Sequence, residues 1–268
     1  MPCPELVHMT ELTQTEGVLQ TQVHGHVLVI TLNRPEAKNA FNAELSRALS
    51  AALDHLDDDP QLRVGVLTGA GGTFCAGMDL KALLKGEVSA TEKRGGFGIM
   101  TLPPNKPLIA AIEGYAVAGG LELALCCDLL IATDAAKFGL PEVKRGLVAV
   151  GGGLFRLPRR IPYHLVMELA LTGDLYPASR LLELGLLSRV VPAGTALEAS
   201  LELAERIATN APLALAATKQ ILSQAHAWSD AEAWPAQRAL ARPALKSNDA
   251  REGARAFAEK RPPVWRGE

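Results

Sequence analysis

Gly119-Gly120-Leu121-Glu122 interrupts a long apolar stretch of this chain, and Phe138-Gly139-Leu140-Pro141-Glu142 follows it. The apolar residues 108–112 are typical of a buried strand, so the glycine pair is expected to open a helix over 121–127. A helix N-terminus presents unpaired N–H groups and partial positive charge, and glycine lets a substrate approach that backbone closely. The stretch therefore predicts a turn that can stabilise an oxygen becoming negative.

Glu122 and Glu142 are the candidate acid and base. Glu122 is flanked by leucine and alanine, where a charge is costly unless it has a partner or a use. A strand expected over 129–133 can return Glu142 beside Glu122, and Pro141 restricts the backbone before it. A lone acidic residue is usually solvated or complements a helix dipole, but this apolar context favours an acid/base pair.

Composition excludes several classes of protein. The chain has 268 residues, 48% of them hydrophobic, which is enough for a substantial core. A formal charge of −2 gives no general attraction to nucleic acid or to anionic membranes. The four cysteines (Cys3, Cys75, Cys126 and Cys127) form no Cys-x-x-Cys motif, so neither a metal site nor a disulfide framework is expected. A reducing cytoplasm fits this cysteine usage best.

The N-terminal residues have no sustained hydrophobic period, so 1–15 are expected to be a loose tail without the features of a targeting peptide. Residues 108–132 are apolar enough to suggest a membrane span. However, Glu113, Glu122 and Asp128 interrupt them, so a buried strand, turn and helix are predicted instead.

The first half of the chain reads as alternating strands and helices. A hairpin is expected over 18–32, a helix over 45–56 and a buried strand over 64–68. The order of strand, glycine-bearing turn and helix then recurs around 108–127, which predicts an α/β spiral of stacked ββα units. Residues 69–74 lack the third glycine of a dinucleotide fingerprint, so a nucleotide-binding sheet is disfavoured.

The C-terminal part has a helical period. We expect a spiral core over 16–196 and a helical region over 197–268. The expected helices are 197–209, 212–225, 230–240 and 250–259, with Asn248-Asp249 capping the last of them.

Several ordered motifs carry a resemblance to a known family. They are Asn33-Arg34-Pro35, Lys38-Asn39-Ala40, Thr68-Gly69-Ala70-Gly71-Gly72, Phe74-Cys75-Ala76-Gly77-Met78-Asp79-Leu80, Lys106-Pro107 through Asp128, Phe138 to Gly153, and Leu171-Thr172-Gly173-Asp174. With these motifs the chain resembles the crotonases, the enoyl-CoA hydratase/isomerase superfamily, from about residue 18 to 265. The resemblance implies a crotonase-type spiral and an acyl-CoA thioester substrate. It also implies a C-terminal trimerisation region, and a homotrimer or a dimer of trimers as the assembly.

The resemblance also assigns site residues. It places the two N–H groups that hold the thioester oxygen at Met78 and Gly119, and it matches Glu122 and Glu142 to the two glutamates of the hydratases. The resemblance implies a binding site for coenzyme A, which is part of the substrate. It implies no metal and no redox cofactor. The implied residues of the coenzyme A site are Lys38, Ala40, Ala76, Asp79, Leu80, Lys81, Phe257 and Lys260, and two sources are open for the last two, the same chain or a neighbouring subunit.

The chain departs from typical hydratases at Val150. Relatives have a proline and a glycine before the glycine run, whereas this chain has Val150 before Gly151-Gly152-Gly153. The valine is therefore expected to narrow the space for water or for the acyl chain.

The retained pair of glutamates favours an enoyl-CoA hydratase. A carnitinyl-CoA dehydratase is the first alternative, because the sequence around 74–81 and the chain end resemble that group. An enoyl-CoA isomerase is the second. A non-catalytic acyl-CoA-binding protein of the same fold is the alternative from another class, and the near-neutral charge argues against an RNA-binding relative.

Overall fold

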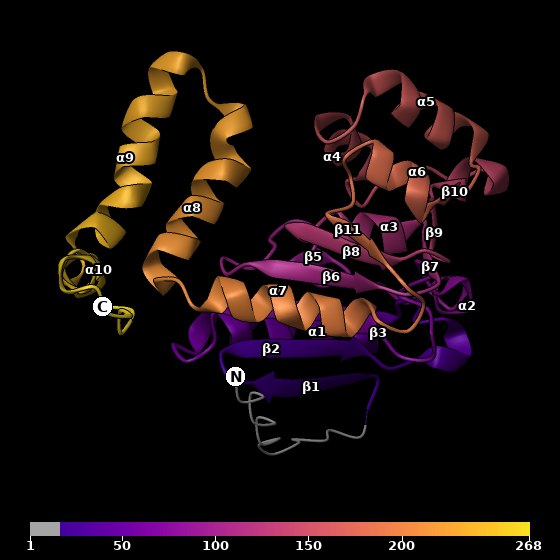
Figure 1. The fold of residues 1–268 in the computed structure, drawn as a ribbon. Helices are drawn as coiled ribbons and strands as arrows, with labels where there is room; N and C mark the ends of the chain where they lie inside the picture. The colour runs from indigo at the N-terminus through magenta and orange to yellow at the C-terminus, as the bar shows by residue number, and fades with distance from the viewer. Residues whose placement is uncertain (1–16) are drawn as a thin grey trace.

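The main sheet of the molecule has six strands. In the computed structural model, which describes residues 17–268, its strand order is β1-β2-β3-β6-β8-β11 (Figure 1). The strands are β1 (Leu19–His24), β2 (Val27–Leu32), β3 (Val64–Gly69), β6 (Leu108–Ile112), β8 (Leu129–Thr133) and β11 (Arg189–Val191). The β1–β2 hairpin is antiparallel and every later pair is parallel. The tail expected over 1–15 lies outside the described residues.

A smaller sheet lies beside the ends of these strands. It contains β7 (Tyr115–Val117), β9 (Lys137–Gly139) and β10 (Tyr176–Pro177) in the order β10-β9-β7. Two isolated parallel bridges occur in addition. Cys75 pairs with Ala116 of β7, and Phe41 pairs with Met78. The chain therefore passes from β6 to β7 and from β8 to β9 before turning into helical structure, and the predicted spiral of ββα units is confirmed.

The two faces of the main sheet bury separate apolar clusters. On β2, Leu28 and Ile30 belong to the cluster shared with α1 (Ala43–Asp58), whereas Val27 and Val29 belong to the cluster that includes residues of α7 (Ala196–Ala208). This alternation follows from the two-residue period of a strand. Since α7 covers one face of the sheet, the helix that begins at Ala196 is part of the packed core.

Helix α3 (Gly119–Ala124) is shorter than the predicted 121–127. The N–H groups of Cys126 and Cys127 bond to carbonyls three residues earlier, so the chain tightens into a turn. The next residue, Asp128, donates its N–H to the carbonyl of Leu108 as the chain enters β8. The chain must turn sharply here so that β8 can lie beside β6. This turn ends α3 at Ala124, before the predicted end at 127.

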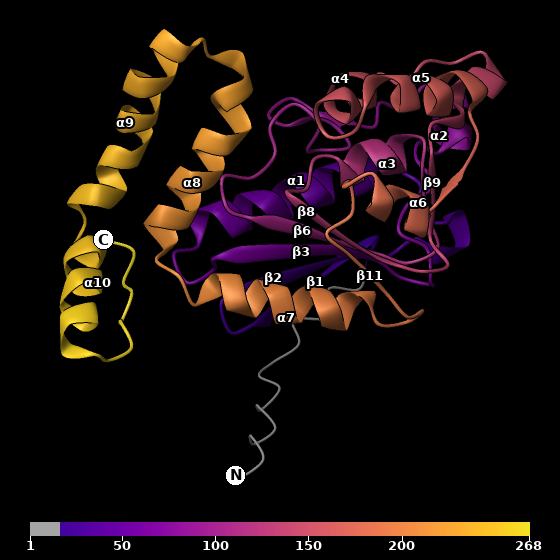
Figure 2. The same ribbon diagram turned by 45° about the horizontal axis from the view of Figure 1, so that its top comes forward.

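Further elements connect these strands and helices (Figures 1 and 2). They are η1 (Pro35–Ala37), α2 (Leu80–Leu84), β4 (Ala90–Thr91), β5 (Gly95–Gly96), η2 (Pro141–Arg145), α4 (Gly153–Arg156), η3 (Leu157–Arg159), α5 (Tyr163–Thr172) and α6 (Ala178–Glu183).

The C-terminal helices form an arm beside the core, α8 (Pro212–Gln224), η4 (Ala225–Ala227), α9 (Asp230–Lys246) and α10 (Asn248–Glu259) (Figures 1 and 2). Helix α9 runs past the predicted end at 240. The cap of α10 is Ser247, whose hydroxyl accepts the N–H of Ala250 at 3.0 Å, so the prediction of Asn248-Asp249 was wrong.

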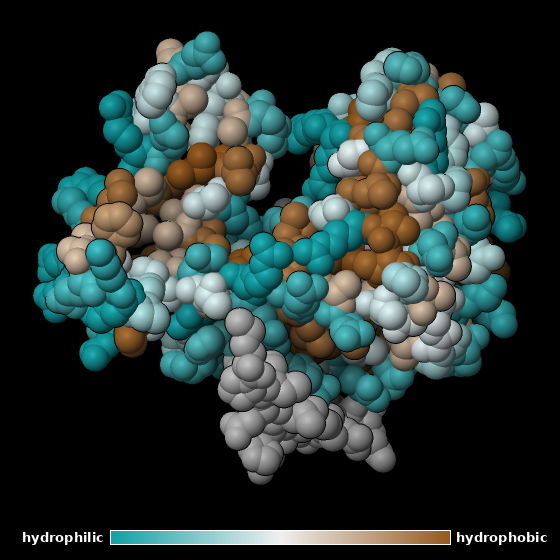
Figure 3. All heavy atoms as spheres, in the orientation of Figure 1, coloured by the Kyte–Doolittle hydropathy of each residue, from teal (hydrophilic) through white to brown (hydrophobic). Residues whose placement is uncertain are grey.

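Neither α8 nor α9 contains a buried residue. Lys219 holds the first of them to the core through Asp128 at 2.7 Å. A notch separates this arm from the part carrying α4 to α6, and hydrophobic residues gather on both (Figure 3). Between residues 17 and 268, no helix is long and apolar enough to cross a membrane.

Candidate active site

One cavity collects half of the predicted site residues, together with Val150. Its volume is about 480 Å³, and α3, η2 and the segments 76–83, 96–100 and 147–151 line it. The predicted residues among its lining are Ala76, Met78, Leu80, Gly119, Glu122, Glu142 and Val150. The structure therefore brings together residues that the chain separates by more than seventy positions.

Glu122 lies in the first turn of α3 and is only 4% exposed. Its Oε1 accepts the N–H of Gly153 at 2.9 Å. Burial raises the pKa of Glu122, whereas the N–H groups of Gly153 and Gly151 and the charge of Arg156 oppose that rise. Glu122 is therefore a buried carboxylate whose ionised form is stabilised by these N–H groups and by the charge of Arg156.

Fewer contacts stabilise the ionised carboxylate of Glu142 than that of Glu122. Glu142 follows Pro141 in η2, and its Oε2 is buried without a hydrogen-bond partner among residues 17–268. Burial raises the pKa of Glu142; its own backbone N–H opposes the shift, and the nearby charge of Glu122 adds to it. A buried oxygen without a partner in a cavity wall marks a place where a bound molecule can donate or receive a proton.

The N–H groups of Met78 and Gly119 both face the cavity. The carbonyl of Gly77 accepts the N–H of Phe41 at 2.8 Å, and the N–H of Met78, on the same planar peptide, therefore points the opposite way. The carbonyl of Ala118 accepts bonds from within α3, so the N–H of Gly119 points out of the helix start. In the described chain neither N–H has a protein acceptor.

The two backbone segments that carry these N–H groups touch. A Cβ added at Gly77 would lie 3.0 Å from the nitrogen of Gly119, and Gly77 itself has φ +96°. Only glycine at 77 allows this approach without strain. The pair of donors is therefore built by close contact between two glycines.

Ala118, which sequence reasoning missed, shapes the same turn. Its φ of 52° and ψ of −130° are unusual for a residue with a side chain, and its N–H bonds to the carbonyl of Gly139 at 2.9 Å. Such strain gathers where a functional backbone must be held in one conformation. An alanine before a helix carries no sequence signal of it.

The glycine run 151–153 is shaped around Glu122. A Cβ at Gly151 would lie 2.6 Å from Oε2 of Glu122 and 2.4 Å from the sulfur of Met100. Arg156, another residue missed by sequence reasoning, holds this segment by donating to the carbonyls of Gly151 at 3.0 Å and Met100 at 2.6 Å. Val150 borders the cavity with its side chain 86% exposed, and its predicted effect on water or acyl chain stays a prediction.

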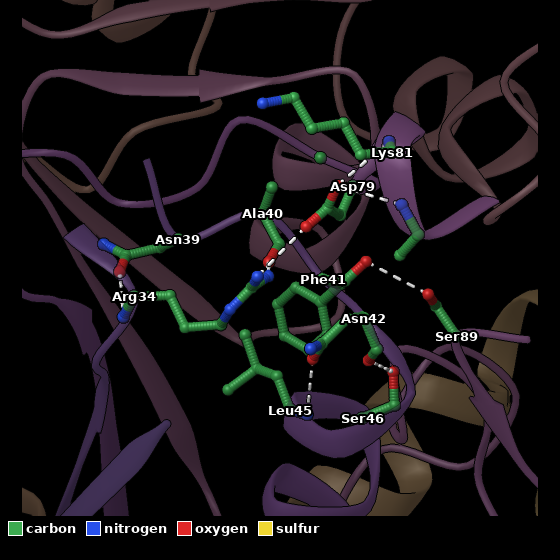
Figure 4. Close-up of polar contacts among 12 residues, drawn as sticks. Arg34, Asn39, Ala40, Phe41, Asn42, Leu45, Ser46, Asp79, Lys81 and Ser89 are labelled. Atoms are coloured by element: carbon green, nitrogen blue, oxygen red, sulfur yellow. Dashed lines mark hydrogen bonds and ion pairs between the residues drawn. The ribbon is translucent and has the colours of Figure 1, made fainter. Parts of the chain in front are cut away.

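The segments predicted to hold coenzyme A are tied together by Arg34. Its guanidinium forms an ion pair with Asp79 at 3.0 Å and also donates to the carbonyl of Ala40 (Figure 4). Oδ1 of Asp79 in turn accepts the N–H of Lys81 at 3.0 Å, at the start of α2 (Figure 4). The carboxylate of Asp79 is therefore occupied within the protein, which assigns it a part in holding this loop.

Lys38 lies beside the same loop. It has φ 51°, and its Nζ lies 5.8 Å from the ring centroid of Tyr115. Its carbonyl accepts the N–H of Ala76 at 3.0 Å, which joins the two predicted coenzyme A segments. Asn39, buried beside it, donates to the carbonyls of Ala70 and Thr73 and so fixes the turn.

Phe257 and Lys260 are not brought to the cavity by this chain. Phe257 lies in α10 and Lys260 caps the end of this helix, which lies on the opposite side of the molecule from α2 and α3 (Figures 1 and 2). Phe257 is 87% exposed. Their assignment to coenzyme A stays a prediction that requires a second copy of the chain.

The sequence model of the enoyl-CoA hydratase/isomerase family matches residues 22–268. The chain belongs to the enoyl-CoA hydratase/isomerase family. The predicted crotonase resemblance is therefore confirmed, and the family supports an enzyme that binds acyl-CoA thioesters.

Several named members of this family are similar to this chain over nearly its whole length. The enoyl-CoA hydratase EchA19 of Mycobacterium tuberculosis is 43% identical, with 89% of this chain and 92% of that protein covered. The carnitinyl-CoA dehydratase of Proteus mirabilis is 44% identical, with coverage of 93% and 98%. A crystal structure of an enoyl-CoA hydratase from M. tuberculosis H37Rv is 55% identical, with a TM-score of 0.92 and coverage of 94% and 100%.

Proposed function

We propose that this member of the family is an enoyl-CoA hydratase, which adds water reversibly across the C2=C3 bond of trans-2-enoyl-CoA thioesters. The observation that carries the proposal is that Glu122 and Glu142 share one cavity with two N–H groups that have no protein acceptor in the described chain. Two acids and an oxyanion site are what hydration of an unsaturated thioester requires.

The surroundings of the two glutamates suggest how they divide the work. Glu122 has an N–H bond from Gly153 and the charge of Arg156 to support its ionised form, so we assign it as the base. Glu142 has an unpartnered Oε2 and the charge of Glu122 beside it, so we assign it as the acid that keeps its proton. Environments that differ in this way separate acid from base at neutral pH.

In the hydration direction, Glu122 takes a proton from water while the water oxygen bonds to C3. The π electrons of the C2=C3 bond move toward the thioester, and the negative charge that develops on its oxygen is held by the N–H groups of Met78 and Gly119. Glu142 then gives its proton to C2, which completes the 3-hydroxyacyl-CoA. The proposed reaction uses no metal and no redox cofactor.

The cavity favours an apolar acyl group over a cationic one. Its described lining includes Leu83, Met100, Leu147 and Val148, and Arg145 adds a positive charge. Recognition of a quaternary ammonium typically uses aromatic faces, and Phe97 is the single aromatic residue in that lining. These features disfavour the carnitinyl-CoA alternative, although relatives of that name are similar in sequence.

The assembly we propose is a homotrimer or a dimer of trimers, working in the cytoplasm. Helices α8 and α9 have no buried residues in the single chain, and Leu222 and Leu245 are more than 70% exposed. Packing against another copy would cover such an arm. A trimer has three times the mass of one 28.4 kDa chain, which light scattering after size exclusion measures directly.

The proposed activity is tested by following the loss of enoyl-thioester ultraviolet absorbance. The substrates are trans-2-enoyl-CoA thioesters of increasing chain length, together with crotonobetainyl-CoA. We expect rapid loss with the alkyl substrates and slow loss with crotonobetainyl-CoA. The reverse order would support the carnitinyl-CoA alternative, and thioester binding with no turnover of any substrate would support a non-catalytic binder.

A further inference from the structure

Two stacked phenylalanines lie behind the proposed oxyanion site. The rings of Phe41 and Phe97 are nearly parallel, with centroids 4.2 Å apart and an interplanar angle of 5°. Their exposed fractions are 0% and 3%. Neither ring has a group that takes part in proton transfer, so a role in the reaction must come from packing, either on the backbone that carries the donors or, for Phe97, which lines the cavity, on the acyl group.

Phe41 is joined to the segment that carries Met78. Its N–H donates to the carbonyl of Gly77 at 2.8 Å, and its carbonyl accepts the N–H of Asp79 at 2.9 Å. These bonds flank Met78 on both sides and leave its own N–H directed at the cavity. Ser89 adds a third bond, because its hydroxyl donates to the carbonyl of Phe41 at 3.0 Å (Figure 4).

Phe97 lies against the other donor. A Cβ added at Gly119 would lie 2.7 Å from both Cε2 and Cζ of this ring, so the ring edge occupies the space beside the glycine. The N–H of Phe97 donates to the carbonyl of Ser89 at 2.8 Å, and its φ is 53°. A strained backbone and the Ser89 link thus fix the ring's position relative to Phe41.

A buried arginine holds the Phe97 segment in place. Arg94, whose side chain is 2% exposed, donates to Asp54 at 2.8 Å, to Asp57 at 2.9 Å and to the carbonyl of Leu102 at 2.9 Å. Both aspartates belong to α1. Arg94 therefore holds this segment against α1, a helix of the core. The Phe97 ring packs against Gly119.

We infer that Phe41 and Phe97 are positioning residues that set the spacing of the N–H groups of Met78 and Gly119. The backbone of Phe41 is bonded to one donor segment and the ring of Phe97 packs against the other, and the stack acts as a rigid spacer between them. The inference rests on the proposed function, since it assumes that these N–H groups hold a thioester oxygen. A displacement of a donor by about 1 Å is enough to weaken transition-state stabilisation severely.

The test is the infrared carbonyl band of bound butyryl-CoA carrying ¹³C at the thioester carbon. This saturated thioester cannot be hydrated, and two N–H donors lower its carbonyl frequency relative to that of the free molecule. We expect Phe97→Leu and Phe97→Met to lose at least half of that shift. Dissociation constants should stay within about threefold, and kcat for an enoyl-CoA should fall by about 10- to 100-fold.

Leu181→Ala is the control, because it removes buried apolar volume from α6, which forms no backbone hydrogen bond to either donor segment. We expect it to lower the melting temperature while leaving the carbonyl shift unchanged. Phe41→Leu should reproduce the effect of Phe97→Leu, and the double variant should lose little more than either single one, because both act through one stack.

The outcomes separate the two ideas. If both Phe97 variants shift the carbonyl band as far as the wild-type protein does, the positioning role is wrong and the two rings are ordinary core residues. If the wild-type protein binds butyryl-CoA without shifting its band, the proposed oxyanion site itself is wrong.

Discussion

Oε1 of Glu122 lies 2.9 Å from the backbone nitrogen of Gly153. This contact joins the first turn of α3 to the start of α4, across a separation of 31 positions in the chain. It fixes the carboxylate of the proposed base by a backbone N–H donor that, among substitutions at position 153, only proline would remove. The glycine run around Gly153 is therefore as much a part of the site as the glutamate.

Substitutions in that glycine run should be graded by the space each one fills. A methyl group at Gly151 meets Oε2 of Glu122 at 2.6 Å, whereas one at Gly153 meets Cγ of Glu122 at 3.1 Å. We expect Gly151→Ala to lower kcat by about 100-fold, because it displaces the carboxylate, and Gly153→Ala by about tenfold. Steady-state kinetics check the order, and equal effects would show that contact with Glu122 is not what requires glycine.

Each glutamate should be needed for turnover but not for binding. We expect Glu122→Gln and Glu142→Gln each to reduce kcat by about 10²- to 10⁴-fold, the usual contribution of a positioned acid or base. Calorimetric titration with butyryl-CoA should show nearly unchanged affinity. Glu198→Gln, at an exposed position on α7, is the matched control. Full activity in either active-site variant would remove that residue from the mechanism.

Removal of Arg156 should change the pH dependence of the reaction. The charge of Arg156 lowers the pKa of Glu122 against the effect of burial, so Arg156→Met should raise that pKa further. Because an ionised Glu122 is the proposed base, the acidic limb of kcat/KM should move to higher pH. Arg159→Met, one turn away and exposed, is the control and should leave the limb in place. An unmoved limb in Arg156→Met would argue against Glu122 as the base.

Glu142 should reduce stability at neutral pH. Burial raises its native pKa above the ordinary value of 4.5. As the pH rises through the window between 4.5 and this native pKa, the unfolded chain releases a proton that the folded chain still holds. The free energy of unfolding therefore decreases across that window. We expect Glu142→Gln to melt at a higher temperature than the wild-type protein at pH 7, with the gap narrowing below pH 4.5. Calorimetry that finds a constant gap would contradict the burial argument.

Much of the fold followed from periodicity alone. The alternation in β2 and the leucines of α1 indicate their own buried faces, because each period matches one element. Glu122 and Glu142 were identifiable because charges in apolar sequence are costly without a function.

Other parts of the site left no local signal. The strained Ala118 reads as an ordinary helix former, and Arg156 and Arg94 read as surface charges until tertiary contacts bury or engage them. Phe41 and Phe97 are 56 positions apart, and only the folded chain stacks their rings. Features that depend on contacts between distant segments are therefore the ones that sequence patterns omit.

The most direct test of the central claim is the reaction of purified protein with trans-2-hexenoyl-CoA in H₂¹⁸O, followed by mass spectrometry. The proposed mechanism predicts 3-hydroxyhexanoyl-CoA with a single ¹⁸O in its hydroxyl group, and loss of this product in Glu122→Gln and Glu142→Gln. Formation of 3-hexenoyl-CoA without ¹⁸O would indicate an isomerase, and free acid with ¹⁸O in its carboxylate would indicate thioester hydrolysis. Either result would contradict the assignment of this chain as a hydratase.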